Sequence, residues 1–427
     1  MKKVLIISPY FPPSNTPDMQ RVRMSLPYFK QFGWEAEVVV VDSHYTDLQK
    51  DELLIQTIPV DIKIHTVKAL NKSWTAKLGF GNIAFRSYAA YKQKVNELLG
   101  KEKFDLVYFS TTQFAICTLG AYWKKRFGIP YVIDMQDPWH SDYYRDKPKH
   151  QQPPKYWLSY RINKYLEPKA MLQVDGLISV SESYISVLKN RYSQLKDIPA
   201  ATIPFAGFKP DFELASRNKD KFDHLLDPDF KSLVYVGRGG TDLHNAVKPM
   251  FSALKDLLDA EPDKFGKIKL YFIGTSYAPT GQGVPTIAPL AQTFGIANNV
   301  VEITNRVSYF NSLAILQQAD ALFIPGSDDP QYTASKIYTY LLSQKPLITI
   351  FNSKSPAIKI LSECGASNNH SFNDTAVLNL AIKRFITALI DNELAEPVYD
   401  NTCMDKHSAL NMTKLQCELF NEVLNTI

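Results

Sequence analysis

Apolar runs alternate with amphipathic stretches along the first half of the chain. Continuous aliphatic and β-branched segments are typical of parallel strands that are covered on both faces. They occur at residues 3–8, 36–41, 106–110, 130–134, 176–180 and 201–204. Stretches with helical periodicity lie between them, at residues 19–32, 114–126, 156–172 and 182–192. The alternation predicts a Rossmann-like α/β domain over residues 1–205.

The pattern weakens over residues 206–230, which we interpret as an interdomain connection, and then begins again. Further apolar runs occur at residues 232–237, 269–274, 300–303, 321–325 and 346–351, separated by helical patterns. They predict a second Rossmann-like domain over residues 231–405. Residues 406–427 have helical periodicity and are expected to pack back across the domains. Doubly wound sheets bind ligands at the carboxyl ends of their strands, so we expect a cleft between the two sheets.

Composition narrows the class of protein. The hydrophobic fraction of 45% is that of a globular chain. No apolar run approaches the roughly 20 residues of a membrane span, and the apolar stretch at the N-terminus is short and interrupted by proline. A cytoplasmic protein is therefore expected. The cysteines lack metal-site spacing and are expected to be buried thiols, not a disulfide framework: Cys117, Cys364, Cys403 and Cys417.

The net charge of +5 is unevenly distributed. Residues 66–103 hold eight Lys and Arg against two Glu, with aromatic residues between them. Basic and aromatic residues together suit an anionic membrane surface or a polyanionic acceptor. The alternative is a solvated amphipathic helix whose aromatic residues belong to the core. Nucleic acid is not expected as a partner, because no recognised nucleic-acid module is present.

A glycine-rich segment follows the strand predicted at residues 232–237. Gly237, Arg238, Gly239 and Gly240 lie there, at a strand end and before a helix. Glycines allow backbone N–H groups to approach a phosphate, and arginine offers a planar cationic fork for its oxygens. The segment matches neither the GxGxxG nor the Walker pattern, so alone it is a weak phosphate signal.

A second candidate anion site lies in the stretch SKIYTYLLSQKPLITI, residues 335–350. Ser335 and Lys336 stand at the start of a predicted short helix, where backbone N–H groups are unpaired and the dipole is positive. The alternative is an ordinary serine cap beside a solvated lysine. Both candidate sites would lie at the carboxyl edge of one sheet, where one diphosphate could contact both.

The first half offers a candidate acid or base. Asp137 follows the strand predicted at residues 130–134 and lies beside Trp139 and His140. A carboxylate in this position could orient an acceptor or act as a base, although Asp-Pro is also a common turn opener. Arg21 and Arg23 follow the proline-rich first loop and are interpreted as bridging the domains or meeting solvent.

Several of these segments, in this order, resemble the GT-B glycosyltransferases and, within them, the retaining glycosyltransferase family 4. The resemblance rests on ISPYFPPSNTPDMQRVR, GIPYVIDMQDPW, VDGLISVSES, IPFAGF, LVYVGRGG, IKLYFIGT, QQADALFIPGSDDP and SKIYTYLLSQKPLITI. It implies metal-independent transfer of a sugar from a nucleoside diphosphate sugar, with no further cofactor. The nucleotide would bind to the second domain, and the acceptor, a surface glycan or a lipid-linked oligosaccharide, to the first.

Carried over by position, the resemblance assigns a role to each candidate residue. The catalytic residues would be Asp137, Arg238 and Lys336, and the donor-binding residues would be Gly237, Gly239, Gly240, Ser335 and Thr339. Thr339 and Gln331 stand where the family commonly has glutamates, and Gln136 replaces its histidine. These departures leave two alternatives open: a nucleotide-sugar 2-epimerase of the same fold, or a non-catalytic protein that binds a nucleotide or a partner. The enzyme would be cytoplasmic, with a peripheral position on the inner face of the plasma membrane as one option.

Overall fold

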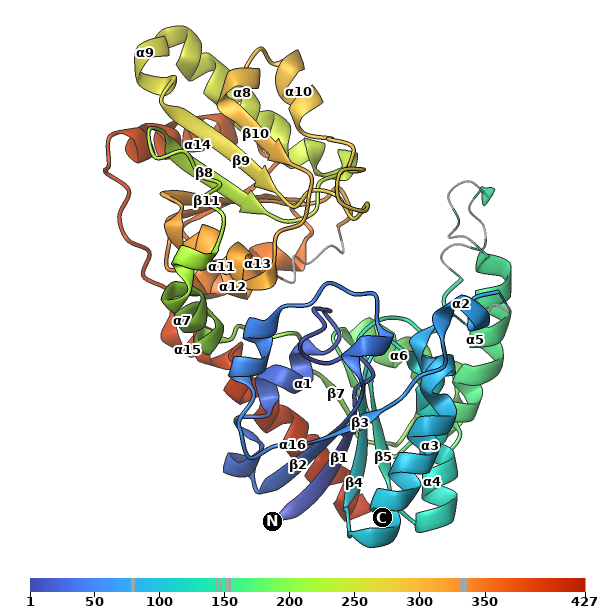
Figure 1. The fold of residues 1–427 in the computed structure, drawn as a ribbon. Helices are drawn as coiled ribbons and strands as arrows, with labels where there is room; N and C mark the ends of the chain where they lie inside the picture. The colour runs from blue at the N-terminus through green and yellow to red at the C-terminus, as the bar shows by residue number, and fades with distance from the viewer. Residues whose placement is uncertain are drawn as a thin grey trace. The chain divides into compact units, whose positions relative to one another are not determined.

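The computed structural model describes residues 1–77, 81–142, 145, 148–149, 152, 155–330 and 336–426. The chain forms two compact units (Figure 1). The first contains residues 1–206 together with residues 407–427, and the second contains residues 207–406. Each unit is built around its own parallel sheet.

In the described part of the first unit, seven parallel strands form a sheet of order β3-β2-β1-β4-β5-β6-β7. The strands are β1 (Lys2–Ile7), β2 (Trp34–Val41), β3 (Lys63–Val67), β4 (Leu106–Ser110), β5 (Tyr131–Met135), β6 (Gly176–Ser179) and β7 (Ala200–Thr202). The helices are α1 (Gln20–Ser25), α2 (Lys72–Thr75), α3 (Ile83–Lys101), α4 (Leu119–Phe127), α5 (Tyr156–Met171), α6 (Glu182–Arg191) and α16 (Ala409–Thr426). Helices α3 and α4 cover one face of the sheet, and α1 and α16 the other (Figure 1).

The second unit contains, within its described residues, six parallel strands of order β10-β9-β8-β11-β12-β13. They are β8 (Lys231–Val236), β9 (Ile268–Ile273), β10 (Val300–Ile303), β11 (Ala321–Pro325), β12 (Leu347–Phe351) and β13 (Asn368–Ser371). The helices are α7 (Lys209–Arg217), α8 (His244–Ala260), α9 (Pro262–Phe265), α10 (Ala288–Thr293), α11 (Tyr309–Gln318), α12 (Ile337–Leu342), α13 (Pro356–Glu363), α14 (Thr375–Ile390) and α15 (Asn401–Lys406). The prediction of two α/β domains with parallel sheets is confirmed.

The C-terminal helix α16 belongs to the first unit, although the residues before it belong to the second. Gln416 donates to Ser25 Oγ at 2.8 Å, and Lys2 Nζ donates to Asn421 at 2.7 Å. The Phe420 ring packs 5.4 Å from Trp34 and 5.0 Å from Tyr108, measured between ring centroids. Helix α16 therefore completes a core to which residues near the N-terminus also contribute.

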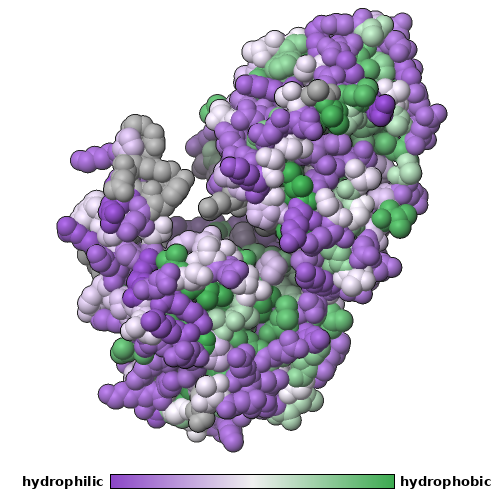
Figure 2. All heavy atoms as spheres, turned by 180° about the vertical axis from the view of Figure 1, so that it is seen from behind, coloured by the Kyte–Doolittle hydropathy of each residue, from purple (hydrophilic) through white to green (hydrophobic). Residues whose placement is uncertain are grey.

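The buried and exposed residues follow the sequence pattern in the central strands and depart from it at the edges. Strands β4, β5, β11 and β12 are buried along their whole length. The sequence did not predict β3 or β13, because an edge strand exposes much of its surface and lacks a continuous apolar run. On the visible face of the molecule, hydrophilic residues predominate and hydrophobic ones are scattered among them (Figure 2).

Two arginines depart from the expectation that they meet solvent or bridge domains, because both are fully buried in the first unit. Arg21 Nε lies 2.7 Å from Asp134 Oδ2, and its Nη2 donates to the carbonyl of Ile203 at 2.7 Å. Arg23 donates to Gln20 Oε1 and to the Thr57 hydroxyl. The helical pattern predicted for residues 19–32 is interrupted at Pro27, so that α1 ends at Ser25 and a separate 3-10 helix follows it.

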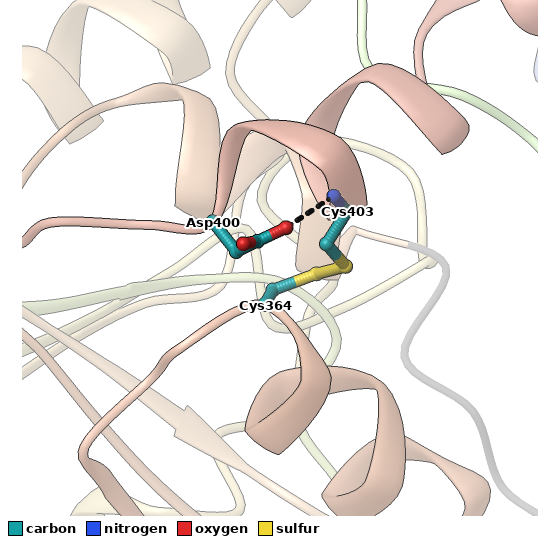
Figure 3. Close-up of a disulfide and its surroundings, with 3 residues drawn as sticks. All are labelled: Cys364, Asp400 and Cys403. Atoms are coloured by element: carbon teal, nitrogen blue, oxygen red, sulfur yellow. Dashed lines mark hydrogen bonds between the residues drawn. A yellow bond between two sulfur atoms is a disulfide. The ribbon is translucent and has the colours of Figure 1, made fainter.

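The cysteine prediction was wrong in one respect. All four cysteines are buried, but Cys364 and Cys403 form a disulfide, with their Cα atoms 5.2 Å apart (Figure 3). Cys364 follows α13 and Cys403 lies in α15, where its N–H donates to Asp400 at 2.7 Å. Their separation of 39 residues carries no local pattern, so only the fold brings the two sulfur atoms together.

Breaking the buried Arg21–Asp134 pair should destabilise the first unit. Arg21→Met leaves an uncompensated carboxylate in the core and should lower the free energy of unfolding by about 3–5 kcal/mol. Adding Asp134→Asn should restore part of this loss, because it removes the stranded charge. Urea unfolding followed by tryptophan fluorescence measures both. As a control, Lys101→Ala breaks an exposed pair with Glu97 and should leave the transition unchanged. If Arg21→Met behaves like Lys101→Ala, the pair has no structural role.

Thiol titration tests the disulfide. The oxidised protein, denatured without reductant, should present two reactive thiols, from Cys117 and Cys417, and reduction should expose the other two. Reduction should lower the free energy of unfolding of the second unit by about 2–4 kcal/mol, because the unfolded chain loses the closed loop. A Cys364→Ala/Cys403→Ala variant should be insensitive to reductant. Four reactive thiols in the unreduced protein would contradict the bond.

Candidate functional site

The second sheet has a topological switch point between β8 and β11. β8 pairs with β9 on one side and with β11 on the other, so the chain leaves these two central strands in opposite directions. The loops at the carboxyl ends of such strands diverge and leave room for a ligand. Arg238 follows β8, and Lys336 precedes α12 in the connection after β11.

The glycines after β8 shape their loop through internal hydrogen bonds. Gly237 N donates to Ile273 O, Gly239 N donates to Thr275 O at 2.8 Å, and Gly240 N donates to Thr286 Oγ1 at 3.0 Å. Gly240 has a φ of 144°, and a Cβ there would lie 2.4 Å from Asp242 Oδ1. These N–H groups are therefore hydrogen-bonded within the protein, and the phosphate contact expected of the glycines stays a prediction.

Arg238 is held by a carboxylate that the sequence analysis did not consider. Its Nη1 and Nη2 atoms donate to the two oxygens of Asp242 at 2.9 and 2.6 Å. Ser327 Oγ donates to the same carboxylate at 2.7 Å, and Asp328 N donates to the Asp242 carbonyl. The hydrogen bonds from Arg238 hold the pKa of Asp242 below its usual value. This network joins the loops on both sides of the switch point.

Lys336 is the N-cap residue of α12. Much of the residue is exposed, but its ammonium turns inward, with Nζ 3.5 Å from the carbonyl of Val236 at the end of β8. Burial of the ammonium, and secondly the positive charge of Arg306, lower the pKa of Lys336 to about 8. Tyr340 fixes the helix against the same strand end, since its hydroxyl accepts from Val236 N at 2.7 Å.

Arg306 is a further cation at the carboxyl edge of the second sheet, and its charge acts on Lys336. It follows β10, its guanidinium lies 4.9 Å from the centre of the Tyr277 ring, and it is close enough to Lys336 to repel its charge. Because the two cations repel each other, binding of an anion beside them is favourable. Arg306 was not among the predicted site residues, although its place three residues after a predicted strand was a usable signal.

Thr339, the predicted ribose contact, lies on α12 and is partly exposed. Ser335 and Gln331 lie outside the described residues, so the role expected of the serine at the helix start stays a prediction.

The first sheet has its own switch point, between β1 and β4, and two carboxyl groups lie near it. Asp18 is buried and accepts from Thr111 Oγ1 and Thr112 N, both at 3.3 Å. Burial raises the pKa of Asp18. Burial also raises the pKa of Asp137, and the nearby Asp18 carboxylate raises it further. The sequence pointed to Asp137 but missed Asp18, which stands in a proline-rich loop without a recognisable pattern.

Gln136 connects this region to the buried pair beneath it. Its Nε2 donates to Asp134 Oδ2 at 2.9 Å, to Ser110 Oγ at 3.0 Å and to the carbonyl of Asp18 at 3.1 Å. Gln136 is therefore a buried structural donor. His140 lies further along the loop, where its N–H donates to Glu167 and burial lowers the pKa of its ring.

A pocket of about 580 Å³ lies at the other end of the second sheet. It is lined by residues at the amino ends of β8 and β11, where Lys231 pairs with Asp320. It lies away from the carboxyl ends of the strands, where sheets of this kind bind ligands, so we do not assign the ligand to it. Within the described ranges, no group of three His, Cys, Asp or Glu side chains could hold a metal ion. Nor is any described helix long and apolar enough to span a bilayer.

No family model and no curated protein matches this chain, but solved structures match its fold. The N-terminal domain of Candida albicans trehalose-6-phosphate phosphatase superposes with a TM-score of 0.59 at 14% identity, covering 99% of this chain and 97% of that one. A UDP-forming trehalose-phosphate synthase from Burkholderia xenovorans gives 0.56 at 12% identity, covering 99% of both. Anabaena HepE in complex with UDP gives 0.54 at 14% identity, covering 98% and 99%. At these identities the likeness concerns the fold: the chain has the GT-B architecture.

Proposed function

We propose that this protein is a retaining glycosyltransferase, of the family 4 type, that moves a hexosyl group from a nucleoside diphosphate sugar to an acceptor hydroxyl. The observation that carries the proposal is the Lys336 ammonium at the carboxyl end of β8, the strand that Arg238 follows, where the charge of Arg306 also acts on it. Structures of the same fold include HepE with UDP-glucose and a UDP-forming synthase with glucose-6-phosphate. A sugar nucleotide as donor is consistent with both observations.

Sugar transfer from a nucleoside diphosphate sugar requires that the departing diphosphate is stabilised. When the bond from the sugar carbon to the β-phosphate oxygen breaks, negative charge accumulates on the phosphate. Fixed cations stabilise this charge without having to reorganise, and they can do so without a metal ion. Lys336 would contact the phosphate directly. Arg238, held rigidly by Asp242, would act as a fixed charge, and Ser335 and Thr339 would contact the phosphate and the ribose.

Asp137 is assigned to the acceptor. A carboxylate whose pKa is raised holds a proton more readily, so it is a better base for the acceptor hydroxyl. The hydroxyl oxygen then forms the new bond to the sugar carbon on the face from which the diphosphate departs, so that the configuration at this carbon is retained. We take the acceptor to be a growing surface glycan or a lipid-linked oligosaccharide, and the enzyme to act in the cytoplasm, at the inner face of the plasma membrane.

One observation favours a second candidate function, a non-catalytic protein that binds a nucleotide or a partner. Asp242 already neutralises Arg238, and Thr339 offers the ribose a neutral group in place of a carboxylate. Nucleotide release from a panel of sugar nucleotides, measured with and without glycan acceptors, separates the candidates. Release that depends on an acceptor indicates a transferase, and binding without release indicates the second candidate. Turnover without an acceptor would indicate an epimerase instead.

Replacing Lys336 should weaken donor binding. Lys336→Ala removes a charge-assisted contact to the diphosphate, so the affinity measured by calorimetry should fall about 10- to 100-fold. Lys354→Ala, an exposed lysine of the same unit, is the matched control and should bind as the wild type does. Equal affinities for the two variants would remove Lys336 from the site.

The affinity should also depend on pH in a defined direction. The free ammonium has a pKa of about 8, and a bound diphosphate raises it by favouring the charged form. Affinity should therefore be full below pH 8 and fall as the pH rises through 8 and above. Calorimetry near pH 8 in buffers of different ionisation enthalpy should detect proton uptake on binding, and Lys336→Ala should abolish it. Proton release would contradict the assignment.

Asp137→Asn should affect transfer more than donor binding. The amide cannot accept the acceptor's proton, so kcat should fall by about 100-fold or more while the donor Kd changes little. Steady-state kinetics together with calorimetry measure the two quantities. A parallel loss of kcat and donor affinity would reassign Asp137 to donor binding or to structure.

A further inference from the structure

Helix α5 presents an unusual outer face to solvent. Trp157, Tyr165 and Leu172 are each more than 60% exposed, and Arg161, Lys164 and Lys169 are exposed beside them. At 100° per residue, these six side chains fall within an arc of about 140° on one side of the helix. We call these six residues the α5 face. Transfer of such exposed aromatic side chains from water to a membrane interface is favourable.

The charge of the α5 face has one sign. Arg161 lies over the Trp157 ring at 5.8 Å, and Lys169 lies over the Tyr165 ring at 3.7 Å. No ion pair links the three cations of this face to an acid among the residues that the structure describes. The one acidic residue of the helix, Glu167, points the other way and is buried. The face therefore offers three cations to an anionic partner, interleaved with large apolar groups.

The stretch that the sequence singled out, residues 66–103, is a weaker candidate for a membrane contact. Tyr91 and Arg86 are buried. Lys94 and Lys101 both pair with Glu97, and Lys72 pairs with Asp47. Trp74 remains exposed, whereas Phe80 lies outside the described residues. Four of the eight basic residues of this stretch are thus buried or in ion pairs, and the other four are spread over α3 and the loops around it and do not gather on one helix face.

The inner face of α5 is attached to the loop that carries Asp137. Glu167 accepts from His140 N at 3.0 Å and also pairs with Arg191 at the end of α6. Asn163 accepts from the Trp139 indole N–H at 3.2 Å. One helix therefore connects an outward-facing basic and aromatic surface to the candidate acceptor loop.

We propose that the α5 face docks this protein onto a bilayer that contains anionic lipids. The cations meet lipid phosphates, and Trp157, Tyr165 and Leu172 enter the interfacial region. Docking places the loop with Asp137 near the lipid surface, where a lipid-linked acceptor would arrive. That last step rests on the proposed function, whereas the docking itself requires neither donor nor acceptor.

Vesicle sedimentation of the full chain, without any sugar nucleotide, tests the docking. The wild type should bind phosphatidylglycerol–phosphatidylcholine vesicles and not pure phosphatidylcholine vesicles. The triple variant Arg161→Gln/Lys164→Gln/Lys169→Gln should bind about 100-fold more weakly, given the usual attraction of each basic residue to an anionic surface. The matched control, Lys92→Gln/Lys94→Gln/Lys101→Gln on α3, removes the same charge from the same unit and should bind within a few-fold of the wild type.

Two further variants test the apolar contribution and the identity of the partner. Trp157→Ala and Tyr165→Ala should each weaken binding even at high salt, where the attraction of charges is screened. Thermal unfolding confirms that every variant folds. Equal losses in the two triple variants would overturn the proposal, since net charge alone would then explain binding. Binding of soluble heparin as tight as binding of vesicles would also overturn it. So would a dimer, detected by sedimentation velocity, that the Trp157→Ala substitution dissociates.

Discussion

The first unit depends on one buried ion pair, between Arg21 and Asp134. Two charges taken out of water are stable only when close contact and further hydrogen bonds offset the lost hydration. Asp134 Oδ2 accepts from Arg21, Ser110 and Gln136, and Arg21 also reaches the carbonyl of Ile203 after β7. The pair thus links α1, β4, β5 and the end of the sheet. Because Gln136 also holds the backbone of Asp18, the position of both candidate carboxyl groups follows from this contact.

The second unit controls charge differently, because its cations are not fully buried. Asp242 and Ser327 fix Arg238 across the switch point, and a tyrosine hydroxyl fixes α12 against β8. Lys336 has no such carboxylate among its described contacts, and burial lowers its pKa. A cation that has lost hydration without gaining a counter-charge is stabilised by any anion that arrives. The lack of a counter-charge marks Lys336 as the residue that would bind the diphosphate, whereas Arg238, paired with Asp242, holds the loops together.

The sequence predicted the architecture well because central parallel strands need continuous apolar runs, and such runs are visible without a structure. It missed β3 and β13, whose exposed faces are polar, and it read α1 and the 3-10 helix after it as one helix. It also expected Arg21 and Arg23 to bridge the domains or to meet solvent, because arginine is rarely buried and the Asp134 partner of Arg21 is distant in the chain. The Cys364–Cys403 disulfide was missed because its two cysteines are also distant in the chain. Local patterns report local structure, and these contacts are not local.

The sequence by itself determined two α/β units, the order of most of their strands along the chain, and the candidate residues: Asp137 and Arg238 at strand ends, and Lys336 at a helix start. Strand ends can be predicted because hydrophobic periodicity marks where a strand stops. Only the tertiary structure decided what each residue contacts. In the structure, Asp242 holds Arg238, and the charge of Arg306 acts on Lys336. The outer face of α5 brings cations beside exposed aromatic rings. The physical reason is that charge pairing and exposure depend on distances through space, and side chains remote in sequence set those distances.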